Sequence, residues 1–132
     1  MDRMIINGGK ILSGSVRISG AKNSAVALIP AAILSDDIVK INGVPNISDI
    51  KALEEILVYL GAKITNKNGK IVIDTKEILN KEIPEHVSKK LRASYYFMSV
   101  LLGKYKKVSM YFPGGCNIGT PFIFTISSLN IA

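Results

Sequence analysis

The single cysteine of the chain, Cys116, lies in the glycine-rich stretch PGGCNIG at residues 113–119. Glycines allow backbone conformations that are closed to other residues, and they let a loop move. A thiol on such a loop can act as an acid or as a nucleophile, because nearby cations or a helix N-terminus favour the thiolate. A cysteine can equally be a small apolar side chain that fills a buried turn. The residues alone leave both interpretations open.

Lys22 and Asn23 stand where a predicted strand gives way to a predicted helix. A lysine at the start of a helix faces the positive end of the helix dipole, which costs a little stability. A phosphate or carboxylate bound there would reverse that sign, since free backbone N–H groups and the ammonium could hold it together. Asn23 would add a side-chain amide. The alternative is an ordinary solvated lysine.

Arg92 falls in a helical pattern that is otherwise apolar, LRASYYFMSVLL at residues 91–102. Its planar guanidinium makes it a candidate for gripping a phosphate, although arginines within helices are usually solvated. The lone histidine, His86, precedes this stretch, and it could pair with Cys116 or occupy a separate surface position. No cluster of His, Cys and carboxylate residues predicts a metal site.

The composition indicates one domain with a real core, since 48% of the 132 residues are hydrophobic. One cysteine cannot form an internal disulfide, and the N-terminal apolar run is too short for a signal peptide. We therefore expect a cytoplasmic protein. No apolar run approaches the roughly 20 residues needed to span a bilayer.

The charge balance, 17 basic against 10 acidic residues, suits anionic ligands from a phosphorylated metabolite to nucleic acid or a membrane surface. Eight basic residues lie between residues 63 and 92, whereas residues 108–132 carry no charge. Tyr95 and Tyr96 could stack on bases, but the chain has no signature of a nucleic-acid-binding module. The glycine pairs at 8–9 and 114–115 also lack the spacing of a dinucleotide fingerprint or a P-loop.

Hydrophobic periodicity and turn residues predict a regular order of elements in the first half of the chain. Pro30 should kink or end the first helix, Ser48 should cap the second, and Gly61 should end it. The pair Asn68-Gly69 predicts a tight hairpin. The predicted elements are strand 16–19, helix 22–34, strand 38–41, helix 48–61, and strands 62–65 and 71–73.

The predicted order starts again after a linker at residues 77–84, with a long helix at 87–102 and a strand at 108–112. If the unit repeats, a second helix and a hairpin should come next. The chain ends inside that second unit, which suggests an incomplete repeat.

Four stretches together resemble one family. They are GGKILSGSVRISGAKNSAVALIPAAIL from residue 8, VPNISDI from residue 44, LRAS from residue 91, and PGGCNIG. In order and spacing they are similar to the N-terminal third of the UDP-N-acetylglucosamine 1-carboxyvinyltransferases, from about Met4 to Thr120. The related 5-enolpyruvylshikimate-3-phosphate synthases share the architecture but lack the Gly-Gly-Cys loop.

The resemblance implies an α/β fold, an inside-out α/β barrel of repeated βαβαββ units, here incomplete. Residues 1–21 would pair with a C-terminal domain, and residues 22–120 would form part of the first enolpyruvyl transferase domain. Residues 121–132 form a divergent, uncharged tail.

The implied activity is transfer of the enolpyruvyl group from phosphoenolpyruvate to the 3-hydroxyl of UDP-N-acetylglucosamine, the first committed step of peptidoglycan synthesis. By this resemblance Lys22 and Asn23 contact phosphoenolpyruvate, Arg92 binds the nucleotide sugar, and Cys116 is the catalytic proton donor on a closing loop. No cofactor, metal, nucleic acid or membrane is expected as a partner. The resemblance does not predict an oligomeric state for this chain.

The resemblance ends at Thr120, where the family continues Arg-Pro-Ile/Val-Asp-Leu-His and this chain continues Pro121-Phe-Ile-Phe. We interpret the change as a frameshift or small deletion near codon 121, followed by early termination. The chain is then expected to be a truncated form that is inactive alone and poorly soluble. The alternative is a non-catalytic basic module that binds nucleotide sugar or nucleic acid.

Overall fold

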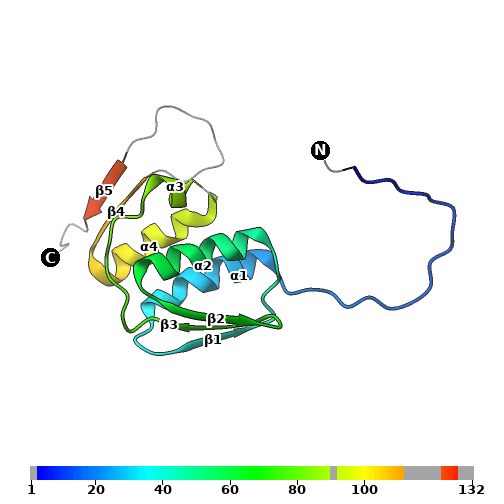
Figure 1. The fold of residues 1–132 in the computed structure, drawn as a ribbon, viewed down its shortest axis with the longest axis horizontal. Coiled ribbons are helices and arrows are strands. Elements are labelled where there is room, and N and C mark those ends of the chain that lie inside the picture. Colours follow the sequence, from blue (N-terminus) through cyan, green and yellow to red (C-terminus); the bar gives the residue numbers. More distant parts are fainter. Residues whose placement is uncertain (1–2, 90–91, 112–122, 128–132) are drawn as a thin grey trace.

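The computed structural model describes residues 3–89, 92–111 and 123–127, which form a layer of helices over a small sheet, beside a separate pair of strands (Figure 1). The sheet contains β1 (Val39–Asn42), β2 (Lys63–Lys67) and β3 (Lys70–Asp74). Its strand order is β1-β3-β2, and both pairings are antiparallel. The helices cover one face of this sheet.

Side chains alternate across the sheet as its period of two requires. Ile71 and Ile73 of β3 are fully buried against the helices. Lys70 points to the opposite face, where it lies directly across from Lys67 of β2. The predicted hairpin between these strands is confirmed, because Asn68 and Gly69 both adopt positive φ, at 51° and 74°.

Helix α1 (Lys22–Ala31) is confirmed at its predicted start, and it tightens into the 3-10 turn η1 (Ala32–Leu34). Pro30 lies inside the helix and has no N–H to donate, so regular hydrogen bonding weakens at this point. The predicted strand at 38–41 is also confirmed, as β1, one residue further along.

Helix α2 (Ser48–Leu60) has the amphipathic pattern that the sequence predicts. Leu53, Ile56, Leu57 and Leu60 are fully buried on one side of it. Gly61 ends the helix in the left-handed region, as predicted. The prediction that Ser48 is the N-cap is wrong: Ser48 is the first helical residue, and its hydroxyl donates to Asp49 Oδ1 at 3.4 Å.

The single helix predicted over 87–102 is also wrong. The described residues form α3 (Glu85–Ser88), the 3-10 turn η2 (Arg92–Ser94) and α4 (Tyr95–Tyr105). Two buried serines explain the interruption, because the Ser94 hydroxyl donates to the Ser88 carbonyl oxygen at 2.9 Å. Such side-chain bonds to the backbone compete with continuous helix.

Strand β4 (Lys107–Tyr111) confirms the predicted strand, and it pairs antiparallel with β5 (Ile123–Ser127). The sequence did not predict β5, which lies in the uncharged tail. A bridge between Ile83 and Met110 ties the segment before α3 to β4.

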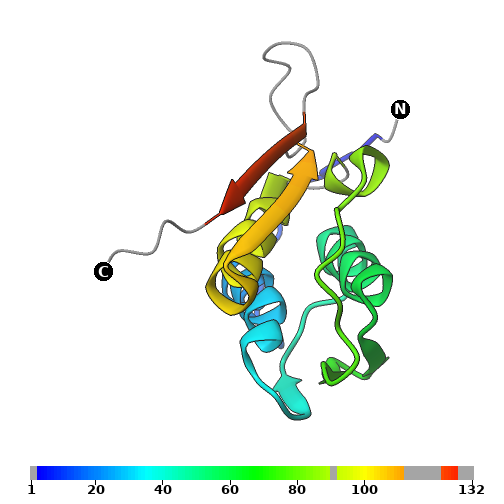
Figure 2. The same cartoon turned by 90° about the vertical axis from the view of Figure 1, so that its left-hand side faces the viewer.

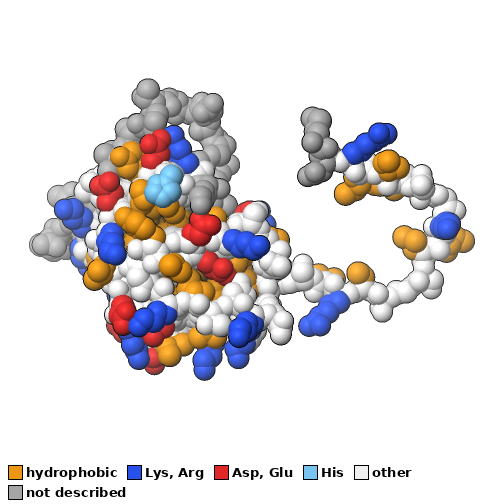
Figure 3. Space-filling model, in the orientation of Figure 1, with side chains coloured by type: hydrophobic (Ala, Val, Ile, Leu, Met, Phe, Trp, Pro, Cys, Tyr) orange, Lys and Arg blue, Asp and Glu red, His pale blue; other side chains and the backbone are white. Residues whose placement is uncertain are grey.

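The N-terminal arm, residues 3–19, extends away from the helices and sheet (Figure 1). The strand predicted at 16–19 is not formed, because these residues have no strand partner within the described part of the chain. Apolar side chains along the arm are exposed (Figure 3): Met4, Ile5, Ile6, Ile11, Leu12, Val16 and Ile18. At its root Gly20 packs so tightly on Gly43 that any side chain would overlap the Gly43 carbonyl oxygen.

The helices α1, α2 and α4 run in the same direction, so all three begin at the same end of the helix layer (Figure 1). Seen along the layer, α1 lies beside both of the others (Figure 2), and its contacts with α2 and α4 agree. Within the described residues, no helix has the length and apolar character needed to cross a membrane.

We predict that Gly61→Ala lowers the free energy of unfolding by about 1–3 kcal/mol. Gly61 has a φ of 111°, and an added Cβ would lie 2.6 Å from the Glu77 carbonyl oxygen. Gly103→Ala is the matched control, because its Cβ would meet only Leu34 Cδ2, at 3.7 Å, and alanine favours the helix by about 0.5–1 kcal/mol. Urea unfolding measures both changes, and equal effects would contradict this account of Gly61.

Candidate functional site

Lys22 is the first residue of α1, and its ammonium forms an ion pair with a carboxylate of α2. Lys22 Nζ lies 2.5 Å from Asp49 Oδ2, and the side chains are 55% and 24% exposed respectively. Asp49 lies in the first turn of α2. The pair therefore joins the starts of two neighbouring helices.

The start of α1 is electrostatically unusual, because it has no side-chain cap and no acidic residue in its first turn. Asn23, the second residue, is exposed. Backbone N–H groups at a helix start carry partial positive charge, so the Lys22 cation is unfavourable there without a partner. A partly exposed ion pair contributes only about 0–1 kcal/mol, so stability alone is a weak reason to place Lys22 there.

The structure brings part of the predicted site to one end of the helix layer. Lys22 and Asn23 begin α1, while the backbone of Arg92 begins η2, directly before α4 (Figure 1). Three helix starts at one end favour anions. The side chain of Arg92 and the whole of Cys116 lie outside the described residues, so their predicted roles stay predictions.

His86 lies in α3 and is exposed. Its suggested pairing with Cys116 is untested, because Cys116 lies outside the described residues. Among the residues that the structure describes, no three His, Cys, Asp or Glu side chains are grouped so that they could hold a metal ion.

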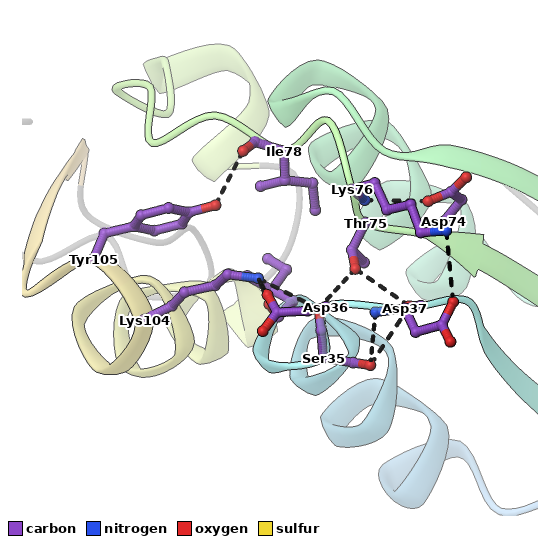
Figure 4. Close-up of polar contacts among 10 residues, drawn as sticks. Ser35, Asp36, Asp37, Asp74, Thr75, Lys76, Ile78, Lys104 and Tyr105 are labelled. Atoms are coloured by element: carbon purple, nitrogen blue, oxygen red, sulfur yellow. Dashed lines mark hydrogen bonds and ion pairs between the residues drawn. The ribbon is translucent and has the colours of Figure 1, made fainter.

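A polar network that was not predicted from the sequence lies at the other end of α1 (Figure 4). Lys104 Nζ donates to the Ile33 carbonyl oxygen at 2.7 Å, to that of Ser35 at 3.3 Å, and to Asp36 Oδ1 at 3.0 Å. The Thr75 hydroxyl also donates to the Ser35 carbonyl oxygen, at 2.9 Å. Backbone carbonyl oxygens at the end of η1 accept most of these bonds, so the network stabilises the fold.

An open pocket of about 310 Å³ lies between β4, β5 and the segment before α3, and it contains none of the predicted site residues. Its lining is polar: Asn80, Lys81, Glu82, Lys107, Ser109 and Thr125. The Thr125 hydroxyl donates to Ser109 Oγ at 3.1 Å, and the Ser109 hydroxyl donates to Glu82 Oε2 at 3.3 Å. These bonds join the two strands to the preceding loop.

Lys63 of β2 forms an ion pair with Glu77 that includes none of the predicted site residues. A hydrogen bond from Lys63 to Glu77, with the charge of that carboxylate, raises the pKa of Lys63 above its ordinary value. Both side chains are exposed, so the pair affects surface charge and not the chemistry at the helix starts.

The family model described as EPSP synthase (3-phosphoshikimate 1-carboxyvinyltransferase) matches residues 6–123. The chain belongs to this family. Its curated relatives include proteins named UDP-N-acetylglucosamine 1-carboxyvinyltransferase 2, 49% identical over 121 residues in Lactococcus lactis and 50% identical over 118 residues in Listeria monocytogenes. These matches cover 90% and 89% of this chain, but only 29% and 28% of the relatives.

A solved structure of the same kind, the enolpyruvyl transferase NikO from Streptomyces tendae, superposes with a TM-score of 0.69 at 28% identity. That match covers 77% of this chain and 24% of NikO. The predicted fold class is confirmed: the described residues form part of an enolpyruvyl transferase-like α/β fold.

We predict that Lys104→Met lowers the free energy of unfolding by about 1–3 kcal/mol, because it removes the donor to the partly buried Ile33 carbonyl oxygen, while the Ser35 carbonyl oxygen keeps its bond from Thr75. Lys51→Met on the exposed side of α2 is the control and should change stability by less than about 0.5 kcal/mol. Thermal unfolding compares the two. A loss confined to Lys51→Met, or no loss in either variant, would contradict the assigned role of Lys104.

Proposed function

We propose that this chain is the N-terminal part of an enolpyruvyl transferase that acts on phosphoenolpyruvate and UDP-N-acetylglucosamine, and that it serves peptidoglycan synthesis in the cytoplasm. The observation that carries the proposal is the 47–50% identity, over 118–121 residues, to relatives named for this reaction. The position of Lys22 where three helices begin supports it, since phosphoenolpyruvate carries a phosphate and a carboxylate.

The proposed reaction is an addition followed by an elimination. The sugar 3-hydroxyl loses its proton and attacks C2 of phosphoenolpyruvate, while an acid delivers a proton to C3. Phosphate then leaves C2 of the tetrahedral adduct as C3 gives up a proton, which restores the carbon–carbon double bond as an enol ether.

Each predicted residue has a physical task in this scheme. Lys22 and Asn23 hold phosphoenolpyruvate, and the Lys22 ammonium offsets phosphate charge as it shifts in the transition state. Arg92 grips the nucleotide sugar with its planar guanidinium. Cys116 supplies the proton to C3, for which a thiol suits because its pKa lies close enough to neutrality.

The exposed N-terminal arm supports the proposed division of the chain. Residues 1–21 would pair with a C-terminal domain, residues 22–120 would belong to the first domain, and residues 121–132 would be the divergent tail. Such pairing would bury the seven large apolar side chains that the extended arm exposes.

A binding module for nucleotide sugar or nucleic acid is the second candidate, and the sheet favours it. Lys40, Lys67 and Lys70 share the outer face of the sheet, where β3 places Lys70 opposite Lys67. Like charges directly opposite one another are unfavourable, and a bound polyanion would relieve that repulsion. Among the described strand residues of this face there is no arginine or aromatic side chain, which weighs against specific base recognition.

We predict that the purified chain of residues 1–132 shows no turnover. By the family resemblance, the aspartate that deprotonates the sugar hydroxyl and further arginines of the phosphoenolpyruvate site are not among these residues. The measurement is release of inorganic phosphate from phosphoenolpyruvate in the presence and absence of UDP-N-acetylglucosamine. Release that depends on the nucleotide sugar would refute the prediction.

We also predict that UDP-N-acetylglucosamine binds in preference to a short oligonucleotide. Calorimetric titration with each ligand compares them, and the double variant Lys67→Gln/Lys70→Gln should leave the nucleotide-sugar affinity unchanged. Binding of the oligonucleotide alone, lost in that variant, would favour the binding module over the transferase.

A further inference from the structure

The stretch VPNISDI at residues 44–50 is one of the four that carry the family resemblance, yet no part of the proposed reaction uses it. Its acidic residue is Asp49, whose carboxylate lies 2.5 Å from the ammonium of Lys22. The stretch therefore contacts the residue that the proposed function places against phosphoenolpyruvate.

The position of the Asp49 carboxylate is fixed from two directions. Asp49 Oδ2 meets Lys22, while Asp49 Oδ1 accepts a hydrogen bond from the Ser48 hydroxyl at 3.4 Å. The start of α2 favours a carboxylate, and four fully buried side chains further along hold that helix in place: Leu53, Ile56, Leu57 and Leu60.

Lys22 is fixed at its backbone in the same way, by the buried residues Ala25, Val26 and Ile29 of α1. Its side chain is long and flexible, and without a partner it would sample many conformations. The ion pair with Asp49 restricts that freedom in the protein without ligand. An ammonium has three N–H donors, so pairing with one carboxylate oxygen does not prevent it from donating to an anion.

We infer that Asp49 is a positioning residue, which holds the Lys22 ammonium at the start of α1 for phosphoenolpyruvate. This inference rests on the proposed function, because it assigns Asp49 to the same site. The pair is formally neutral, so it offers a small free anion little net charge. The Lys22–Asp49 pair should bind more strongly a ligand that needs a hydrogen-bond donor at the position of the Lys22 ammonium.

Selectivity tests this role better than affinity does. Replacing Asp49 with asparagine removes a negative charge, which favours every anion at the site. The same change frees Lys22, which weakens only ligands that need the oriented ammonium. Phosphoenolpyruvate carries more negative charge than inorganic phosphate, so the loss of the Asp49 charge alone would raise the ratio of Kd for phosphate to Kd for phosphoenolpyruvate. A fall in that ratio therefore reports the loss of positioning.

The experiment titrates the ¹⁵N-labelled chain with phosphoenolpyruvate and, separately, with inorganic phosphate, and it follows the backbone amide signals of residues 22–25. We expect the ratio of Kd for phosphate to Kd for phosphoenolpyruvate to fall at least threefold in Asp49→Asn and to be retained in Asp49→Glu. Glu85→Gln is the matched control, because Glu85 forms an equally short, partly exposed ion pair with Lys89.

The outcomes separate this inference from the proposed function. If wild type and Asp49→Asn show the same ratio, while Lys22→Met weakens phosphoenolpyruvate binding, the positioning role is overturned and the proposed site stands. If Lys22→Met binds phosphoenolpyruvate as wild type does, the proposed site itself is overturned. If neither anion moves these signals in any variant, both are overturned.

Discussion

Burial of helix α1 between α2 and α4 is the constraint on which the rest of the structure depends. The helix is apolar over most of its surface and has no broad polar face to turn toward water. Burial of a large aliphatic side chain such as Ile29 contributes roughly 1.5–3 kcal/mol, so α1 must lie against other elements. Because all three helices run in the same direction, this packing also gathers their starts at one end. The packing that builds the core thus also arranges the candidate site.

Elements with a strong local signal could be predicted from the sequence. Asn68 and Gly69 adopt the positive φ values that a two-residue hairpin needs, and Gly61 ends α2 in the left-handed region. These outcomes depend on the conformations open to a few neighbouring residues. The end of α3 at Ser88 could not be predicted in this way, because it depends on a bond from the Ser94 hydroxyl to the Ser88 carbonyl oxygen, and both residues are buried by the rest of the fold. The strand expected at 16–19 likewise needs a partner strand that its own residues cannot supply.

The sequence predicted individual residues of the candidate site, but it did not predict the contacts between them. The sequence placed Lys22 at the start of a helix, which the structure confirms. It gave no reason to pair Lys22 with Asp49, which is 27 residues away, because that contact depends on how α1 packs against α2. The bonds from Lys104 to the end of η1 span about 70 residues and have the same origin. For Arg92 and Cys116, the proposed roles rest on family resemblance and on the chemistry of their side chains.

The contact between Gly20 and Gly43 marks the boundary between the N-terminal arm and the helices and sheet. No side chain fits between these two residues, because a Cβ on Gly20 would occupy the space of a carbonyl oxygen. The arm beyond this point extends away from the described helices and sheet, so a substitution in it leaves their packing unchanged. Residue 20 has no such freedom. Gly20 therefore sets the point at which the arm leaves the helices and sheet, because a side chain at this position would force the backbone at Gly43 to move.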